Sequence, residues 1–158
     1  MKKIIITQSL FFFSLFICGY LFYESWRADM FTCIADVDFT VNTKNTSARL
    51  DSDYDFIIGR SSDASIHVNG LFYVGENKYE INRTYFFNYL KSKGDVLYTM
   101  NFVRREVHSP DNAPSEIYEN LFLPQSKNAP YFIKIQHLRN DLYLIEGLKR
   151  TYFTCQRQ

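Results

Sequence analysis

Residues 49–58, Arg-Leu-Asp-Ser-Asp-Tyr-Asp-Phe-Ile-Ile, decide the fold class of this chain. Apolar Leu50, Tyr54, Phe56 and Ile58 alternate there with arginine and aspartate. A period of two places successive side chains on opposite faces of a β-strand, whereas a helix needs a period of 3.6. The stretch therefore predicts a strand with one face in an apolar core and the other in water.

The same alternation continues on both sides of this stretch. Residues 33–41 precede it across a polar turn at 42–47, and residues 65–74 follow it. Gly75-Glu76-Asn77 then predicts a tight hairpin into residues 79–87. Further strands are expected at residues 96–103, 131–138, 142–146 and 151–155.

A single short helix interrupts the strands. Residues 108–115 contain two prolines and predict a loop. Pro114, the early acid Glu116, and Ile117 with Leu121 four positions apart then predict a helix that ends near residues 123–124. We therefore predict a mainly β fold of seven or eight antiparallel strands with one short helix. Such a meander closes most naturally into a barrel, because closure removes exposed strand edges.

The N-terminus predicts a membrane anchor. Lys2 and Lys3 precede a run from Ile4 to Tyr23 that holds no charged residue. About 20 residues that rise about 1.5 Å each span a hydrocarbon core of about 30 Å. Two lysines before the span place the N-terminus in the cytoplasm. Five residues are then expected to anchor the span at the membrane interfaces: Lys2, Lys3, Tyr20, Tyr23 and Trp26. We expect a cytoplasmic tip and transmembrane helix over residues 1–27 and a β-domain over residues 28–158.

Two other interpretations of the N-terminus remain open. A cleaved signal peptide has an apolar region of about 7–15 residues and small residues at its cleavage site. This run is longer, and Ser25-Trp26-Arg27-Ala28 carries bulky residues there. A lipoprotein signal at Leu15-Phe16-Ile17-Cys18 would place the large Ile17 beside the modified cysteine. We favour an uncleaved anchor in a bacterial inner membrane, with the β-domain in the periplasm.

The part of the chain after the anchor carries almost no net charge. Of 18 basic and 17 acidic residues in the whole chain, 15 and 16 remain once Lys2, Lys3, Arg27 and Glu24 are set aside. A nucleic-acid surface needs a basic stripe, so no direct binding of nucleic acid is expected. The remaining length of about 130 residues suits one folded domain.

The three cysteines fall in two environments. Cys18 lies within the apolar run, where a small apolar residue facing lipid is ordinary. Cys33 and Cys155 bracket the β-domain, with no Cys-x-x-Cys motif and no histidine close in sequence. Two lone cysteines in an oxidising compartment usually pair. We therefore predict a structural Cys33–Cys155 disulfide.

Catalytic and cofactor motifs are absent from the sequence. It contains no Gly-x-Ser-x-Gly, no His-Glu-x-x-His, no glycine-rich phosphate loop and no calcium loop. We expect no enzymatic activity, no cofactor and no metal site. Asp51, Asp53 and Asp55 carry an alternative interpretation as a cation site, but at strand spacing they form a solvent-facing row.

The three histidines are isolated in the sequence. His67 falls on the polar face of its strand, and His108 and His137 follow much later. The plain interpretation makes all three exposed surface residues. The alternative makes one or more of them a pH sensor, because histidine titrates near neutral pH.

Aromatic residues are unusually abundant, with 15 Phe and 12 Tyr. An aromatic core is the simpler explanation of this excess. An apolar pocket or partner face is the functional one, because aromatic residues are enriched at such sites. Tyr98 and Phe102 add to the bulk, and the candidate pocket or core residues are Tyr54, Phe56, Phe72, Tyr79, Tyr85 and Phe87.

The layout of the chain resembles a known family. The start Met1-Lys2-Lys3, an immediate single span, Phe31-Thr32-Cys33 and Phe153-Thr154-Cys155 are similar to the FidL-like family of small bacterial inner-membrane proteins. More loosely, they resemble the PsaF, MyfF, ToxS and VtrC accessory proteins of ToxR-like regulators. That resemblance implies a periplasmic, lipocalin-like barrel that binds and stabilises a membrane-anchored ToxR-like transcriptional regulator, with a small amphipathic ligand in an apolar pocket.

Two functions are therefore expected from the sequence. The first is a single-pass accessory protein that pairs with a ToxR-like regulator. The second is a tethered periplasmic binding or envelope-assembly module that works alone. The first predicts clear stabilisation of the domain by a partner, and the second predicts a stable monomer with a closed pocket.

Overall fold

The computed structural model describes residues 13–23, 31–42, 47–92, 97–122, 129–148 and 151–158. The chain divides into two units, residues 1–30 and residues 31–158. The boundary predicted between residues 27 and 28 lies outside the described residues.

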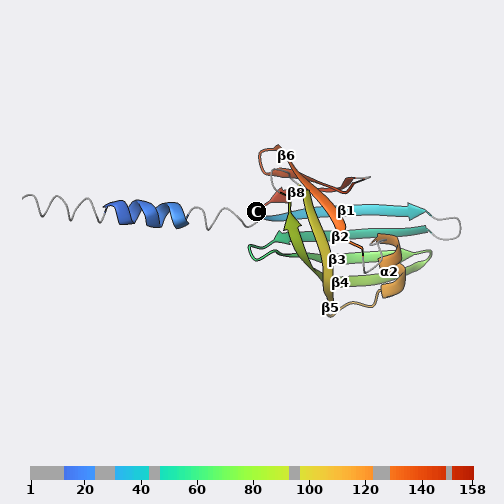
Figure 1. The fold of residues 1–158 in the computed structure, drawn as a ribbon. Helices are drawn as coiled ribbons and strands as arrows, with labels where there is room; N and C mark the ends of the chain where they lie inside the picture. The colour runs from blue at the N-terminus through green and yellow to red at the C-terminus, as the bar shows by residue number, and fades with distance from the viewer. Residues whose placement is uncertain (1–12, 24–30, 43–46, 93–96, 123–128, 149–150) are drawn as a thin grey trace, which may run out of the picture. The chain divides into compact units, whose positions relative to one another are not determined.

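The described residues of the second unit form eight strands and one helix (Figure 1). The helix α2 spans Ser115–Phe122, within the range that the sequence predicts. The strands are β1 (Phe31–Asn42), β2 (Ser47–Ile58), β3 (Asp63–Val74), β4 (Asn77–Lys91), β5 (Leu97–Val107), β6 (Tyr131–Arg139), β7 (Leu142–Glu146) and β8 (Thr151–Arg157).

Each strand pairs antiparallel with the next one along the chain, and β8 returns to β1. The sheet is a closed barrel, which confirms the predicted barrel and gives it eight strands. The seam between β1 and β8 is short, since only Cys33↔Arg157 and Ile34↔Gln156 are in register there. The predicted Cys33–Cys155 disulfide is present at this seam, with 5.5 Å between the two Cα atoms.

Alternation along each strand fills the barrel as the sequence predicts. On β2, Leu50, Phe56 and Ile58 are buried, while the aspartates between them face outward. The core continues through Phe72 and Val68 on β3. Burial of these large apolar side chains contributes about 25 cal/mol for each Å² removed from water, which makes the barrel interior the main source of stability.

The strands differ in length, and this difference shapes the barrel. Strands β1 to β5 run for 11 to 15 residues, whereas β6, β7 and β8 have 9, 5 and 7. β1 therefore extends past β8, and β5 pairs with β6 only over Leu97–Met100. Helix α2 packs against Phe72 of β3 through Tyr118 and Phe122.

Residues 13–23 of the first unit are helical, and Tyr20 and Tyr23 are exposed on that helix. Within the parts of the chain that the structure describes, no helix has both the length and the apolar character to cross a membrane. The start of the predicted span and the predicted interface residues Lys2, Lys3 and Trp26 lie outside the described residues.

Candidate functional site

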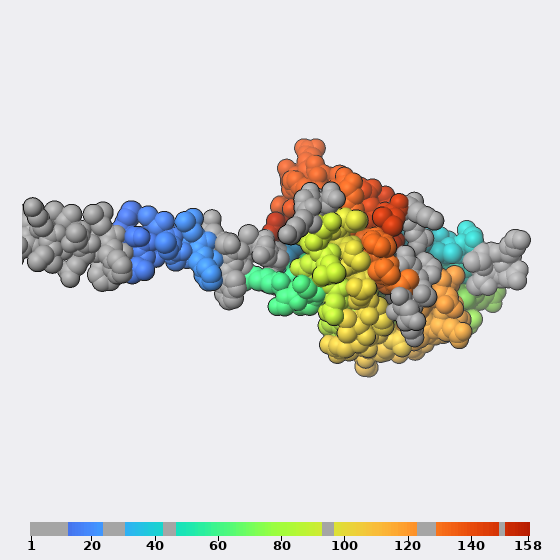
Figure 2. All heavy atoms as spheres, in the orientation of Figure 1, coloured from blue at the N-terminus to red at the C-terminus, as the bar shows by residue number. Residues whose placement is uncertain are grey.

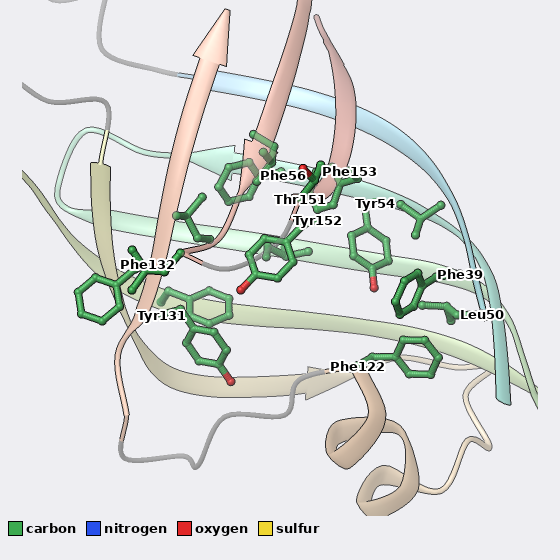
Figure 3. A pocket seen from close by; sticks show the side chains of 16 residues that line it. Phe39, Leu50, Tyr54, Phe56, Phe122, Tyr131, Phe132, Thr151, Tyr152 and Phe153 are labelled. Atoms are coloured by element: carbon green, nitrogen blue, oxygen red, sulfur yellow. The ribbon is translucent and has the colours of Figure 1, made fainter. Parts of the chain in front are cut away.

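An apolar pocket is lined by side chains from the barrel strands and from helix α2 (Figure 3). Its volume is about 470 Å³, which is within the range of small-molecule sites. Phe39 and Phe122 lie at one end and Tyr131 and Phe132 at the other. The apolar side chains of its lining are Val37, Phe39, Leu50, Phe56, Ile66, Phe87, Phe122, Phe132, Ile133, Ile145, Leu148 and Phe153.

The remaining lining residues bring hydroxyl groups into the pocket: Tyr54, Tyr131, Tyr152 and Thr151. Burial raises the pKa of Tyr54 and of Tyr131 above the ordinary value of tyrosine, although the hydrogen bond to Tyr118 opposes the shift at Tyr54. Both hydroxyls therefore stay protonated and neutral at physiological pH. Among the described residues, no charged side chain lines the pocket.

Helix α2 forms one wall of the pocket and links it to the core. Phe122 meets Phe39 of β1 at a ring distance of 5.9 Å and Phe72 of β3 at 5.7 Å. One turn earlier, Tyr118 is almost fully buried, and its hydroxyl lies 3.3 Å from that of Tyr54. The spacing of four residues places both rings on the same helix face, so the helix anchors in the core through one ring and lines the pocket with the other.

A buried ion pair lies beneath this helix. Arg83 of β4 points into the barrel and donates to Asp111 through Nε at 2.6 Å and Nη2 at 2.7 Å. The two side chains are 1% and 2% exposed. Arg83 also donates to the carbonyl of Ala113 and lies 5.6 Å from the Tyr118 ring centroid. Together these contacts fasten the loop between β5 and α2 to the barrel interior.

The electrostatics of this pair favour the charged state of Asp111. Burial alone would raise the pKa of its carboxyl group. The hydrogen bonds from Arg83 and from the backbone N–H groups of Asn82 and Ala113 outweigh burial, so the pKa lies below its usual value. A carboxylate held in this way is a structural group, and it does not reach the pocket lining.

The six predicted pocket or core residues separate into two groups. Tyr54, Phe56 and Phe87 line the pocket. Phe72 and Tyr85 are buried in the core, and Tyr79 packs against Phe72 with ring centroids 6.2 Å apart. Tyr98 and Phe102 also pack against the core and do not belong to the lining.

Several pocket residues could not be chosen from the sequence. Phe122, Tyr131, Phe132 and Phe153 come from α2, β6 and β8, which lie far from β2 in sequence. Phe153 of β8 packs against Tyr54 of β2, with ring centroids 5.5 Å apart. For the residues on strands, the sequence signal is an aromatic side chain in a segment with period two, and many such residues end in the core.

The outer face of the barrel brings together two histidines that are distant in sequence. His67 Nδ1 lies 3.0 Å and His108 Nε2 2.9 Å from the hydroxyl of Thr84, and the two rings are 5.8 Å apart. His137 instead contacts the Asn140 carbonyl oxygen and the Tyr143 ring. In the described part of the chain, no group of three or more His, Cys, Asp or Glu is arranged to hold a metal ion.

Comparison with known proteins places the chain in one family. The family model described as "FidL-like putative membrane protein" matches residues 70–155. A search among curated proteins finds no match. The matched segment runs from β3 to Cys155 in β8 and includes α2. Because it covers more than half of the 158 residues, the chain belongs to the FidL-like family, as the resemblance in its sequence predicted.

Proposed function

We propose that this chain is a single-pass inner-membrane accessory protein whose periplasmic barrel binds and stabilises a membrane-anchored ToxR-like transcriptional regulator. In this proposal the N-terminus is cytoplasmic, residues 28–158 are periplasmic, and the pocket takes a small amphipathic ligand. The observation that carries the proposal is the apolar pocket on the side of the barrel where β1 extends past β8. Membership of a membrane-protein family and the Cys33–Cys155 disulfide support the location.

The lining of the pocket indicates the chemistry of the ligand. Twelve apolar side chains favour an aliphatic or aromatic body, and the hydroxyls of Tyr131, Tyr152 and Thr151 offer neutral hydrogen bonds to a polar group. A charged group is costly to bury without a partner, so it would remain at the mouth. The proposal includes no catalytic step, because no carboxylate, imidazole, amine or thiol belongs to the described lining.

The partner is tested by purifying the full-length, affinity-tagged chain from membranes in mild detergent and identifying bound proteins by mass spectrometry. The expected result is co-purification of a single-span protein with a cytoplasmic winged-helix domain, and a longer half-life of that protein when the chain is present. Recovery of the chain as a partner-free monomer would contradict the proposal. Fusions at the C-terminus test the orientation. An alkaline phosphatase fusion is expected to be active, and a green fluorescent protein fusion is expected not to fluoresce.

Ligand binding is tested by filling the pocket. Thr151→Trp places a large ring in the lining, whereas Thr154→Trp makes the same change at an exposed position of β8 outside the lining. We expect Thr151→Trp to weaken binding of anilinonaphthalene sulfonate, an amphipathic probe, by about tenfold or more, because most of its apolar contact is lost. Thr154→Trp should leave the affinity unchanged.

The measurement uses the full chain in lipid nanodiscs, with the isoleucine methyl groups labelled for NMR. Ile66, Ile133 and Ile145 line the pocket, so their signals should shift saturably with the probe. Ile34 lies outside the lining and reports binding of the probe elsewhere. Equal affinities of the two tryptophan variants would place the probe at another site.

A second function is supported by the closure of the barrel. The pocket is already formed within this single chain, and a disulfide holds the seam between β1 and β8. A stand-alone tethered binding or envelope-assembly module needs no more than this. Saturable probe binding by a chain that carries no partner protein would favour this alternative.

A further inference from the structure

One edge of β1 has no neighbouring strand over most of its length. On its first edge, β1 pairs with β2 from Phe31↔Ile58 to Asn42↔Ser47 without a register shift. On its second edge, β8 pairs only with Cys33 and Ile34. Residues 35–42 therefore form a strand edge that faces no other strand among the described residues, at the far cyan end of β1 in Figure 2. We call residues 35–42 the β1 edge.

The direction of the backbone groups on this edge follows from one hydrogen bond. Gln158 donates its N–H to the carbonyl of Thr32, so Thr32 faces β8. Backbone groups of successive residues in a strand point to alternate sides. Asp36, Asp38 and Thr40 therefore direct their N–H and C=O groups toward the open side, while Val41 directs its own toward β2. Such a row of backbone groups is a template for another strand.

The β1 edge borders the pocket. Val37 and Phe39 point inward from it and line the cavity, and Phe39 is 41% exposed. A strand added at this edge would cover Phe39 and narrow the pocket mouth. Its inward-facing side chains would contact Val37, Phe39 and Phe122, so apolar residues suit these positions.

The outer face of the same edge is acidic. Asp36 lies opposite Asp53, and Asp38 lies opposite Asp51. Like charges placed directly opposite are unfavourable in a sheet. Among the described residues, Arg49 compensates part of this charge, with Nη2 at 2.7 Å from Asp38 and 3.7 Å from Asp51. A neighbouring strand with lysine or arginine on its outer face would relieve this repulsion.

We propose that the β1 edge receives an extended segment of the regulator's periplasmic domain, in which apolar residues alternate with lysine or arginine. The inference rests on the proposed function and specifies which face of the barrel the regulator binds. Main-chain hydrogen bonds supply the affinity, and the alternating side chains supply the specificity. A second copy of this chain is a poor occupant, because pairing of two β1 edges would bring their aspartates together.

Proline substitutions test the open side and the paired side of β1 independently. Thr40→Pro removes an N–H that faces the open side, and proline is tolerated on such edges. Val41→Pro removes an N–H that bonds to β2 and breaks the ladder. We expect the unfolding temperature of the full chain to be unchanged by Thr40→Pro and lowered by several degrees by Val41→Pro. Thr40→Pro should nevertheless reduce co-purification of the regulator by about tenfold.

A charge substitution gives a second, independent measurement. Asp36→Lys reverses the charge on the β1 edge, and Asp141→Lys makes the same change in the exposed turn between β6 and β7. Asp36→Lys should reduce recovery of the regulator by about tenfold, and Asp141→Lys should not. A photoreactive benzoylphenylalanine at position 40 should cross-link to an alternating basic and apolar segment, whereas one at Asn69, exposed on β3, should not.

The outcomes distinguish the two proposals. If the wild-type chain recovers no winged-helix regulator, the proposed function fails, and the inference fails with it. If the regulator is recovered equally well with wild type, Thr40→Pro and Asp36→Lys, only the assignment of the β1 edge is overturned. Cross-links from position 69 in place of position 40 would also overturn it.

Discussion

Replacing both bridged cysteines, Cys33→Ala with Cys155→Ala, is expected to lower the free energy of unfolding by about 4–5 kcal/mol. The bridge joins residues 122 positions apart, so its loss restores much conformational freedom to the unfolded chain. It also lies at the seam where β1 and β8 share only two register pairs. Little else in that seam replaces it.

Urea unfolding of the full chain in nanodiscs, followed by tyrosine circular dichroism, measures this loss. Cys18→Ala is the matched control, because Cys18 is an exposed free cysteine outside the barrel. Cys18→Ala removes one thiol without breaking a disulfide and should leave the urea concentration at the unfolding midpoint unchanged. A double variant as stable as Cys18→Ala would show that the bridge does not stabilise the barrel.

Asp111→Asn is expected to cost about 3–5 kcal/mol of stability at neutral pH. The change leaves the guanidinium of Arg83 charged and almost fully buried without its carboxylate. The matched control is Asp38→Asn, which breaks an ion pair of similar geometry with Arg49 at about half exposure. Because exposed ion pairs contribute about 0–1 kcal/mol to the free energy of unfolding, Asp38→Asn should lose little stability.

The double variant Arg83→Met with Asp111→Leu shows which of two causes lowers the stability of Asp111→Asn, the burial of an unpaired charge or the loss of packing. Replacing both partners by apolar residues of similar size removes the unpaired charge, so most of the lost stability should return. Chemical denaturation of the three variants provides the comparison. A double variant as unstable as Asp111→Asn would mean that packing around Arg83, and not its charge, causes the loss.

The same ion pair predicts a dependence of stability on pH. The pKa of Asp111 is lower in the folded chain than in the unfolded chain, where it is about 3.9. The contribution of the ionised Asp111 to the free energy of unfolding is therefore fully present above pH values near 4. This contribution declines as the pH falls through the lower pKa of the folded chain. The difference in stability between wild type and Asp111→Asn should shrink over that range. A constant difference would assign the stabilisation to another group.

The course of the strands could be predicted from the sequence because strand alternation is a local property. Leu50, Phe56 and Ile58 each need only their neighbours in the chain to be assigned to one face of β2. The tight turn at Gly75, where φ is +59°, is also local, since glycine adopts that conformation without steric cost. The helix at Ser115–Phe122 follows from its own capping and spacing signals.

The pocket could not be predicted in the same way. Alternation assigns Phe56 and Phe72 equally to the inner face, and both are fully buried in the core, yet only Phe56 also lines the pocket. The lining brings β2 together with α2, β6 and β8, and the side chains that meet there depend on register between strands. Register pairs residues that are far apart in sequence, so it cannot be read from any short segment of the chain.

Arg83 shows the same limit for a charged residue. Its position between Ile81 and Tyr85 assigns it to the inner face of β4, where a charge is unfavourable unless it is paired. The partner Asp111 lies 28 residues later in a loop, and only the folded chain brings the two together. His67 and His108 meet at Thr84 for the same reason.

The sequence alone thus determined the β class, the helix α2, the disulfide pair and the family, because each depends on local pattern or on a short motif. Tertiary structure alone decided the size of the pocket, the burial of Arg83 and the open edge of β1. Each of these depends on contacts between residues that are far apart in sequence, and those contacts depend on the packing of the whole barrel.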